Sequence, residues 1–218
     1  VHYITQFFRE LTGSISVEKF DQLPLPYRAI GADLENGKTV IMDHGDLPLV
    51  MRASMSVSGV FPPVPYENSL VVDGGIVKNM GVDVGRQLCG DAVIAVDVSS
   101  PNANRQKLES LFAVSEQTIN IAVQRDMQAQ IATLTAKDVL IKPDMGKLTS
   151  TDFNQSAQLI AAGEKAARAM LPSLKRYALS EEDYRVWQEN IAARKPQNQA
   201  IAKVEITPTR WVSKSVLK

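Results

Sequence analysis

An aspartate followed by two glycines is the part of this sequence best suited to chemistry. Asp73 follows the apolar run Leu-Val-Val at residues 70–72 and precedes Gly74 and Gly75. Such a run is typical of a strand buried on both faces, and a carboxylate at its end is costly unless it is paired or used chemically. Glycines allow positive φ and close approach of another segment. Asp73 is therefore either a site carboxylate at the end of a sheet strand or the N-cap of the next helix.

The other residue types that often carry chemistry are sparse. His2 and His44 lie more than forty positions apart, which predicts no metal site. Cys89 is the single cysteine, so the chain cannot form an internal disulfide, and a buried small apolar role fits it best. Asn79 could hold the loop around Asp73 by a hydrogen bond, or could simply cap a helix or turn. We expect neither a metal nor a cofactor.

Strands and helices alternate along most of the chain, which predicts an α/β fold with a largely parallel sheet between helices. Asn36-Gly37 lies between two strand-like runs and is a strong hairpin signal. Asp46 is placed to cap the helix after it. Expected strands cover residues 27–34, 39–43, 70–72, 92–98 and 139–141, and expected helices cover 2–12, 47–54, 82–88, 106–135, 152–178 and 181–194.

Composition argues against nucleic acid binding and against a membrane-spanning helix. The chain has 24 basic and 24 acidic residues, so there is no electrostatic case for nucleic acid binding. No apolar run approaches the roughly 20 residues of a membrane-spanning helix. The 44% hydrophobic and 22% charged fractions are those of an ordinary globular protein.

Three ordered motifs, at residues 26–34, 52–63 and 73–79, resemble the bacterial patatin-like phospholipases. This resemblance implies a three-layer α/β sandwich with a mostly parallel central sheet. It also implies hydrolysis of lipid acyl esters by a Ser–Asp dyad without a metal or cofactor. The matching aspartate is Asp73, which would act as the base, on a turn supported by Gly74, Gly75 and Asn79.

The nucleophile motif of that family is not found in this sequence. The family carries its serine in Gly-x-Ser-x-Gly after a glycine-rich oxyanion loop, and the 218 residues contain neither. Ser56 and Ser58 lack the glycines that tolerate the strain of a nucleophile elbow, and Ser58 stands where the family commonly has proline. We therefore expect the N-terminal part of the domain, with the serine, to lie upstream of Val1, and this chain alone to be inactive.

An apolar loop before Asp73 is a candidate wall for an acyl pocket. Residues 56–65 contain three prolines and a glycine and must be irregular. Val57, Val60 and Phe61 give this loop its apolar character, and they either line the slot for a lipid chain or fill the core.

The C-terminal tail resembles the start of a POTRA domain, through residues 203–207 and 211–217. An ordinary terminal strand and helix is the alternative. We expect a lipase part at 1–178, a helix and polar linker at 179–200, and a truncated second domain at 201–218. The resemblance is to secreted autotransporters, so it implies a secreted or bacterial cell-surface protein; a cytoplasmic one is the alternative.

The favoured function is a lipid acyl hydrolase of the phospholipase A type. Its expected partners are a phospholipid or other lipid ester, a membrane surface and the upstream segment, and a homodimer stays open. The alternative is a lipid-binding pseudoenzyme that kept the fold and lost the serine. A dinucleotide or P-loop binder is excluded, because Asp73-Gly74-Gly75 fits neither glycine-rich motif.

Overall fold

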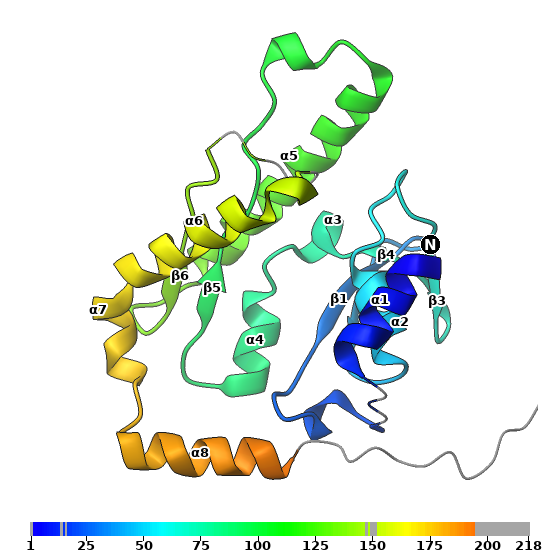
Figure 1. The fold of residues 1–218 in the computed structure, drawn as a ribbon. Helices are drawn as coiled ribbons and strands as arrows, with labels where there is room; N and C mark the ends of the chain where they lie inside the picture. Colours follow the sequence, from blue (N-terminus) through cyan, green and yellow to red (C-terminus); the bar gives the residue numbers. More distant parts are fainter. Residues whose placement is uncertain (1, 14, 16, 147, 149–151, 195–218) are drawn as a thin grey trace, which may run out of the picture.

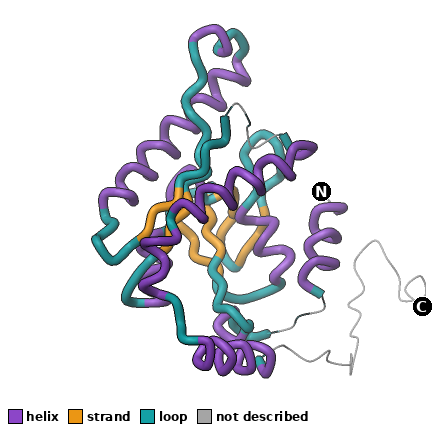
Figure 2. Tube along the Cα trace, turned by 60° about the vertical axis from the view of Figure 1, so that its left-hand side comes forward, coloured by secondary structure: helices purple, strands orange, loops and turns teal. Residues whose placement is uncertain are grey.

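The computed structural model describes residues 2–13, 15, 17–146, 148 and 152–194. Figure 1 shows α1, α2, β1, β3 and β4 on one side of the view, and α5, α6, β5 and β6 on the other. Turned by 60°, the strands lie in the middle with helices around them (Figure 2). The strands are β1 (Ala29–Asp33), β2 (Thr39–Met42), β3 (Val64–Tyr66), β4 (Ser69–Asp73), β5 (Ile94–Val96) and β6 (Val139–Ile141).

The helices match most of the predicted ranges. They are α1 (His2–Thr12), α2 (Leu47–Ser54), α3 (Gly75–Lys78), α4 (Val82–Cys89), α5 (Leu111–Ala132), α6 (Ser156–Ala169), α7 (Leu171–Leu174) and α8 (Glu181–Ala193), with 3-10 turns at Phe20–Gln22, Arg105–Lys107, Phe153–Gln155 and Lys175–Tyr177. The predicted helix at 152–178 is divided, because Pro172 in the first turn of α7 has no N–H to continue α6. The helix predicted from residue 106 begins at Leu111, where Ser110 Oγ caps it by accepting from Ala113 N.

The expected largely parallel sheet is wrong for residues 29–73. β2, β1, β4 and β3 form one sheet in that order, and every neighbouring pair is antiparallel. The short connections from β1 to β2 and from β3 to β4 explain two of these pairings, because parallel strands need a long crossover. In the described part, parallel pairing joins β5 to β6. The fold is a mixed α/β arrangement.

The β1–β2 hairpin follows from residues 33–38. The carboxylate of Asp33 accepts from Glu35 N at 3.0 Å and from Asn36 Nδ2 at 2.7 Å. Gly37 adopts φ 70°, which its missing side chain allows, and its N–H donates to Asp33 O at 2.8 Å. These local bonds fix the turn that the Asn-Gly pair predicts.

The main core lies between α2 and one face of the four-stranded sheet, with α1 packed on α2. β4 is buried on both faces, as predicted, since Val71 and Val72 are almost fully covered. The buried apolar side chains of this cluster are Phe20, Leu23, Ala29, Met42, Leu47, Val50, Ala53, Val64 and Val71. Asp46 occupies the N-cap position of α2, but its side chain makes no cap bond. It pairs with Arg9 of α1 instead, at 3.1 Å.

Strand β5 is shorter and more exposed than expected. Its alternate residues Ile94 and Val96 are about half exposed, and so is Val98 just beyond it, whereas Ala95 and Asp97 are buried. β5 pairs with β6 alone among the described strands. Among the described residues, the outer face of β5 is therefore not covered by the apolar layer that a buried parallel strand needs.

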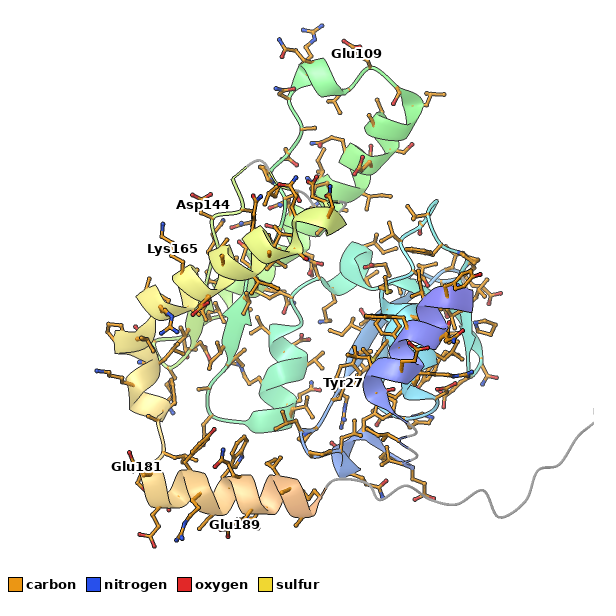
Figure 3. All side chains as sticks on the ribbon, viewed as in Figure 1. Tyr27, Glu109, Asp144, Lys165, Glu181 and Glu189 are labelled. Atoms are coloured by element: carbon orange, nitrogen blue, oxygen red, sulfur yellow. The ribbon has the colours of Figure 1, made fainter. Side chains whose placement is uncertain are left out.

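From α6 to α8 the described chain is mostly helical, and these helices contain no buried residue. Side chains crowd around α1, α2 and their strands, whereas Glu109 lies at the far tip of the segment before α5 (Figure 3). Ser180 caps α8, its Oγ accepting from Asp183 N. No helix within the described residues is long and apolar enough to cross a bilayer. The expected polar linker at 195–199 and the POTRA-like elements at 203–217 lie outside the described residues.

Candidate active site

Asp73 is held by its backbone between two neighbouring segments. It pairs with Gly31 of β1 in the antiparallel register, and its N–H donates to Ser56 O at 3.0 Å. A Cβ on Gly31 would lie 2.3 Å from Val71 Cγ1, so β1 and β4 approach closely because Gly31 has no side chain. The end of β4 is thereby fixed before α3 begins.

The Asp73 carboxylate is half-buried and bonded through one oxygen. Oδ1 accepts from Gly75 N, at the start of α3, at 2.7 Å. Oδ2 has no hydrogen-bond partner in the part of the chain that the structure describes. Burial raises the pKa of Asp73, and the Gly75 N–H opposes that rise because it stabilises the charged form. One oxygen therefore orients the group, while the other is free to accept a proton.

Of the two glycines after Asp73, Gly74 occupies a position where a side chain would not fit, and Gly75 one where a side chain would be tight. A Cβ on Gly74 would lie 2.5 Å from Ile30 O, and a Cβ on Gly75 would lie 3.0 Å from Asp73 Oδ1. The backbone of the turn is consequently packed against β1 on one side and against the carboxylate on the other. Gly74, not Asp73, is the N-cap of α3, and Asp73 lies one residue before it while its carboxylate accepts from Gly75 N.

Asn79 contacts α5 rather than the Asp73 carboxylate. It is the C-cap residue of α3, its N–H donates to Asp126 Oδ2 at 2.9 Å, and its side-chain amide lies 3.7 Å from Met127 Sδ. Three residues later, Val82 N donates to Gln130 Oε1 at 3.1 Å. Sequence reasoning missed the α5 residues, because no local pattern connects them to a turn 47 positions away.

The two candidate serines of the loop before β3 are not presented to Asp73. Ser56 is fully buried, and its Oγ donates to Arg52 O at 2.8 Å. Ser58 is exposed and makes no hydrogen bond with the Asp73 carboxylate within the described residues. The backbone carbonyl of Ser56, not its hydroxyl, is the group that meets Asp73.

The acyl-pocket candidates lie at the surface of the same loop. Val57 and Val60 are 42% and 57% exposed, and Phe61 is half-buried. An open groove of about 450 Å³ lies elsewhere, along α5. Its lining residues are Thr118, Ile121, Ala122, Arg125, Asp126 and Ala129. Within the described residues, no cluster of three or more His, Cys, Asp or Glu side chains could hold a metal ion.

Comparison with known proteins supports the resemblance in part. The family model for patatin-like phospholipases matches residues 9–85. An uncharacterised NTE family protein of Mycobacterium tuberculosis is 28% identical over 175 residues, covering 69% of this chain and 30% of that protein. The patatin-like phospholipase domain-containing protein 7 of Mus musculus is 36% identical over 98 residues, covering 44% of this chain and 7% of that protein.

A second uncharacterised NTE family protein of Mycobacterium tuberculosis is 34% identical over 95 residues, covering 44% of this chain and 26% of that protein. The chain thus spans less than a third of the length of each of these three relatives. The matched stretch runs from α1 into α4 and contains the Asp73 turn. Residues 9–85 of this chain therefore match the patatin-like phospholipase family.

Proposed function

We propose that this chain is the Asp-bearing part of a lipid acyl hydrolase of the phospholipase A type. Asp73 serves as the base of a Ser–Asp dyad, and the nucleophilic serine lies upstream of these 218 residues. The observation that carries the proposal is the Asp73 carboxylate itself: half-buried, with a raised pKa, one oxygen fixed by Gly75 N–H and the other unoccupied within the described residues. A capping aspartate needs no raised pKa, whereas a general base gains from one.

In the proposed reaction, the serine hydroxyl donates to Asp73 Oδ2. Asp73 takes the proton as the serine oxygen attacks the ester carbonyl and the tetrahedral intermediate forms. The intermediate collapses to an acyl-enzyme, and the proton passes to the departing alcohol. A water molecule then donates its proton to Asp73, attacks the acyl carbon and releases the fatty acid, while the serine regains its proton.

The exposed face of β5 supports an upstream segment as the missing partner. Ile94, Val96 and Val98 present apolar side chains to solvent, and a two-stranded parallel sheet is not stable on its own. In the longer protein, further strands paired with β5 and a layer of helices over Ile94 and Val96 would complete a three-layer α/β sandwich. The same segment would bring the serine to Asp73.

The substrate side of the proposal rests on the loop before β3. Val57 and Val60 are exposed, and Phe61 lies half-buried beside them. We place one acyl chain of a phospholipid, drawn from a membrane surface, against these three side chains, since each buried methylene contributes roughly 0.8 kcal/mol. Export to the bacterial surface through a POTRA-like domain at 201–218, after the 179–200 linker, belongs to the same proposal.

The test uses the natural full-length protein, phosphatidylcholine vesicles and a fluorophosphonate serine probe. We expect release of free fatty acid and covalent labelling of a serine upstream of Val1. The 218-residue chain alone should release no fatty acid and take up no probe. Vesicle binding with neither turnover nor labelling would establish the lipid-binding pseudoenzyme instead, and labelling of Ser56 or Ser58 would contradict an upstream nucleophile.

A further inference from the structure

Helix α5 supplies two acceptors to the segment that follows the Asp73 turn. Asp126 and Gln130 lie one helical turn apart, which places them on one face of α5. Asp126 Oδ2 accepts from Asn79 N at 2.9 Å, and Gln130 Oε1 accepts from Val82 N at 3.1 Å. Met127, between them, is 1% exposed and meets the Asn79 amide. The whole loop from α3 to α4 is therefore anchored to α5.

The anchored segment could not hold its conformation by itself. α3 has four residues, and a single helical turn is unfavourable without tertiary contacts because its nucleation fixes many dihedrals for few bonds. The loop after it turns through Gly81 in the left-handed region, at φ 63°. The packing of α3 on α5, together with its contacts with β1, thus holds the Gly75 N–H in place.

The Gly75 N–H is the donor that orients the Asp73 carboxylate, at 2.7 Å from Oδ1. A chain of contacts consequently runs from α5 through Asn79 and α3 to Asp73. We infer that Asp126, assisted by Gln130, is a positioning residue that fixes the catalytic carboxylate through the α3 turn. This inference rests on the proposed function for its catalytic meaning, but the positioning itself can be measured without turnover.

The charged groups around this chain of contacts do not provide another way of orienting Asp73. Lys78 of α3 pairs with Asp83 of α4 at 2.5 Å, and Arg125 of α5 lines the neighbouring groove. Burial raises the pKa of Asp73, the Gly75 N–H lowers it, and no charged group contributes to the shift. A change in the Gly75 bond should therefore appear directly in the titration of Asp73.

A control position lies on the same helix. Gln124 Nε2 donates to Ser100 O at 2.7 Å and so anchors the loop after β5, not the Asp73 turn. Gln124→Ala removes a comparable side-chain bond from α5 and should leave Asp73 unaffected. It separates a general weakening of α5 from a loss of positioning.

The experiment follows the carboxyl ¹³C resonance of Asp73 against pH in the natural full-length protein. We expect Asp126→Ala to move the midpoint of the Asp73 titration to higher pH, because the Gly75 N–H no longer stabilises the charged form. Removing the Asp126 charge alone would move the midpoint the other way, since it removes a like charge. Asp126→Asn loses the charge but keeps an acceptor, so it should not raise the midpoint.

Gln130→Ala should raise the Asp73 midpoint as well, and it carries the test if Asp126→Ala does not fold. In the full-length protein, Asp126→Ala should lower kcat by about tenfold or more with little change in KM, as expected for a misplaced base. An unmoved or lowered Asp73 midpoint in folded Asp126→Ala and Gln130→Ala would overturn the inference. A full-length wild type without turnover would instead count against the proposed function, and the midpoint would still decide the positioning.

Discussion

Replacing Gly74 with alanine tests how closely the Asp73 turn packs on β1. Gly74 has φ −71° and ψ −15°, which alanine adopts without strain, so any cost must come from contacts. The added Cβ would lie 2.5 Å from Ile30 O and 2.7 Å from Ile30 C. Both contacts are with backbone, far inside the 3.5–4.0 Å or so of a favourable carbon contact.

The turn must therefore move away from β1, and Ile30 O, which also accepts from Ser54 Oγ at 2.7 Å, must move with it or lose that bond. We expect Gly74→Ala to lower the free energy of unfolding by about 1–3 kcal/mol, as for other overpacked sites. In a chain of this size that corresponds to a drop in Tm of about 2–12 °C.

Gly163→Ala is the matched control. Gly163 lies within α6 and a Cβ there would meet nothing within 4 Å, so alanine should raise the unfolding free energy by about 0.5–1 kcal/mol. Both variants are compared with the wild-type chain by urea unfolding, followed by circular dichroism. A Gly74→Ala variant as stable as Gly163→Ala would refute the close packing of the turn on β1.

Three further predictions concern pH, substrate and the loop serine. Several hydrogen-bond donors, Arg86 first among them, hold the pKa of Asp138 below its usual range. The contribution of Asp138 to the free energy of unfolding should therefore be fully present above about pH 4 and be lost on further acidification. Urea unfolding at each pH should show a less steep loss of stability in Asp138→Asn. In the full-length protein, Val60→Ala should shift the preferred acyl length among p-nitrophenyl esters. Because Val60 is 57% exposed, the free energy of unfolding should change by less than about 0.5 kcal/mol. An unchanged acyl-length profile in both Val60→Ala and Phe61→Ala would show that the loop does not line the substrate pocket. Ser56→Ala should leave fatty acid release intact, because its hydroxyl donates to Arg52 O; abolished release in a folded variant would contradict that assignment.

The sequence predicts elements whose causes lie within a few residues of one another. The β1–β2 hairpin depends on Asp33, Asn36 and Gly37, and the start of α8 depends on Ser180 and its own first turn. The burial of β4 follows from an unbroken apolar run, and the candidate carboxylate Asp73 stands at the end of that strand. Local hydrogen bonding and hydrophobic pattern are sufficient for these features.

The remaining features depend on contacts between distant segments. Antiparallel pairing of β1 with β4 depends on Gly31, whose missing side chain lets Val71 come close. The support of the Asp73 turn comes from Asp126, and the pattern of α5 gives no sign of it. The exposure of Ile94 could not be predicted from the residues of its strand, because a hydrophobic pattern does not show whether another layer covers that face of the sheet.

The most direct test of the account is the activity of Asp73→Asn in the full-length protein. Asparagine keeps the size of the side chain and an oxygen to accept from Gly75 N–H, but it cannot act as a base. Asp83→Asn is the control, because Asp83 is an exposed carboxylate that pairs with Lys78. Fatty acid release from phosphatidylcholine vesicles should vanish in Asp73→Asn, with Tm close to wild type, and persist in Asp83→Asn. Retention of most of the activity by a folded Asp73→Asn protein would contradict the assignment of Asp73 as the catalytic base.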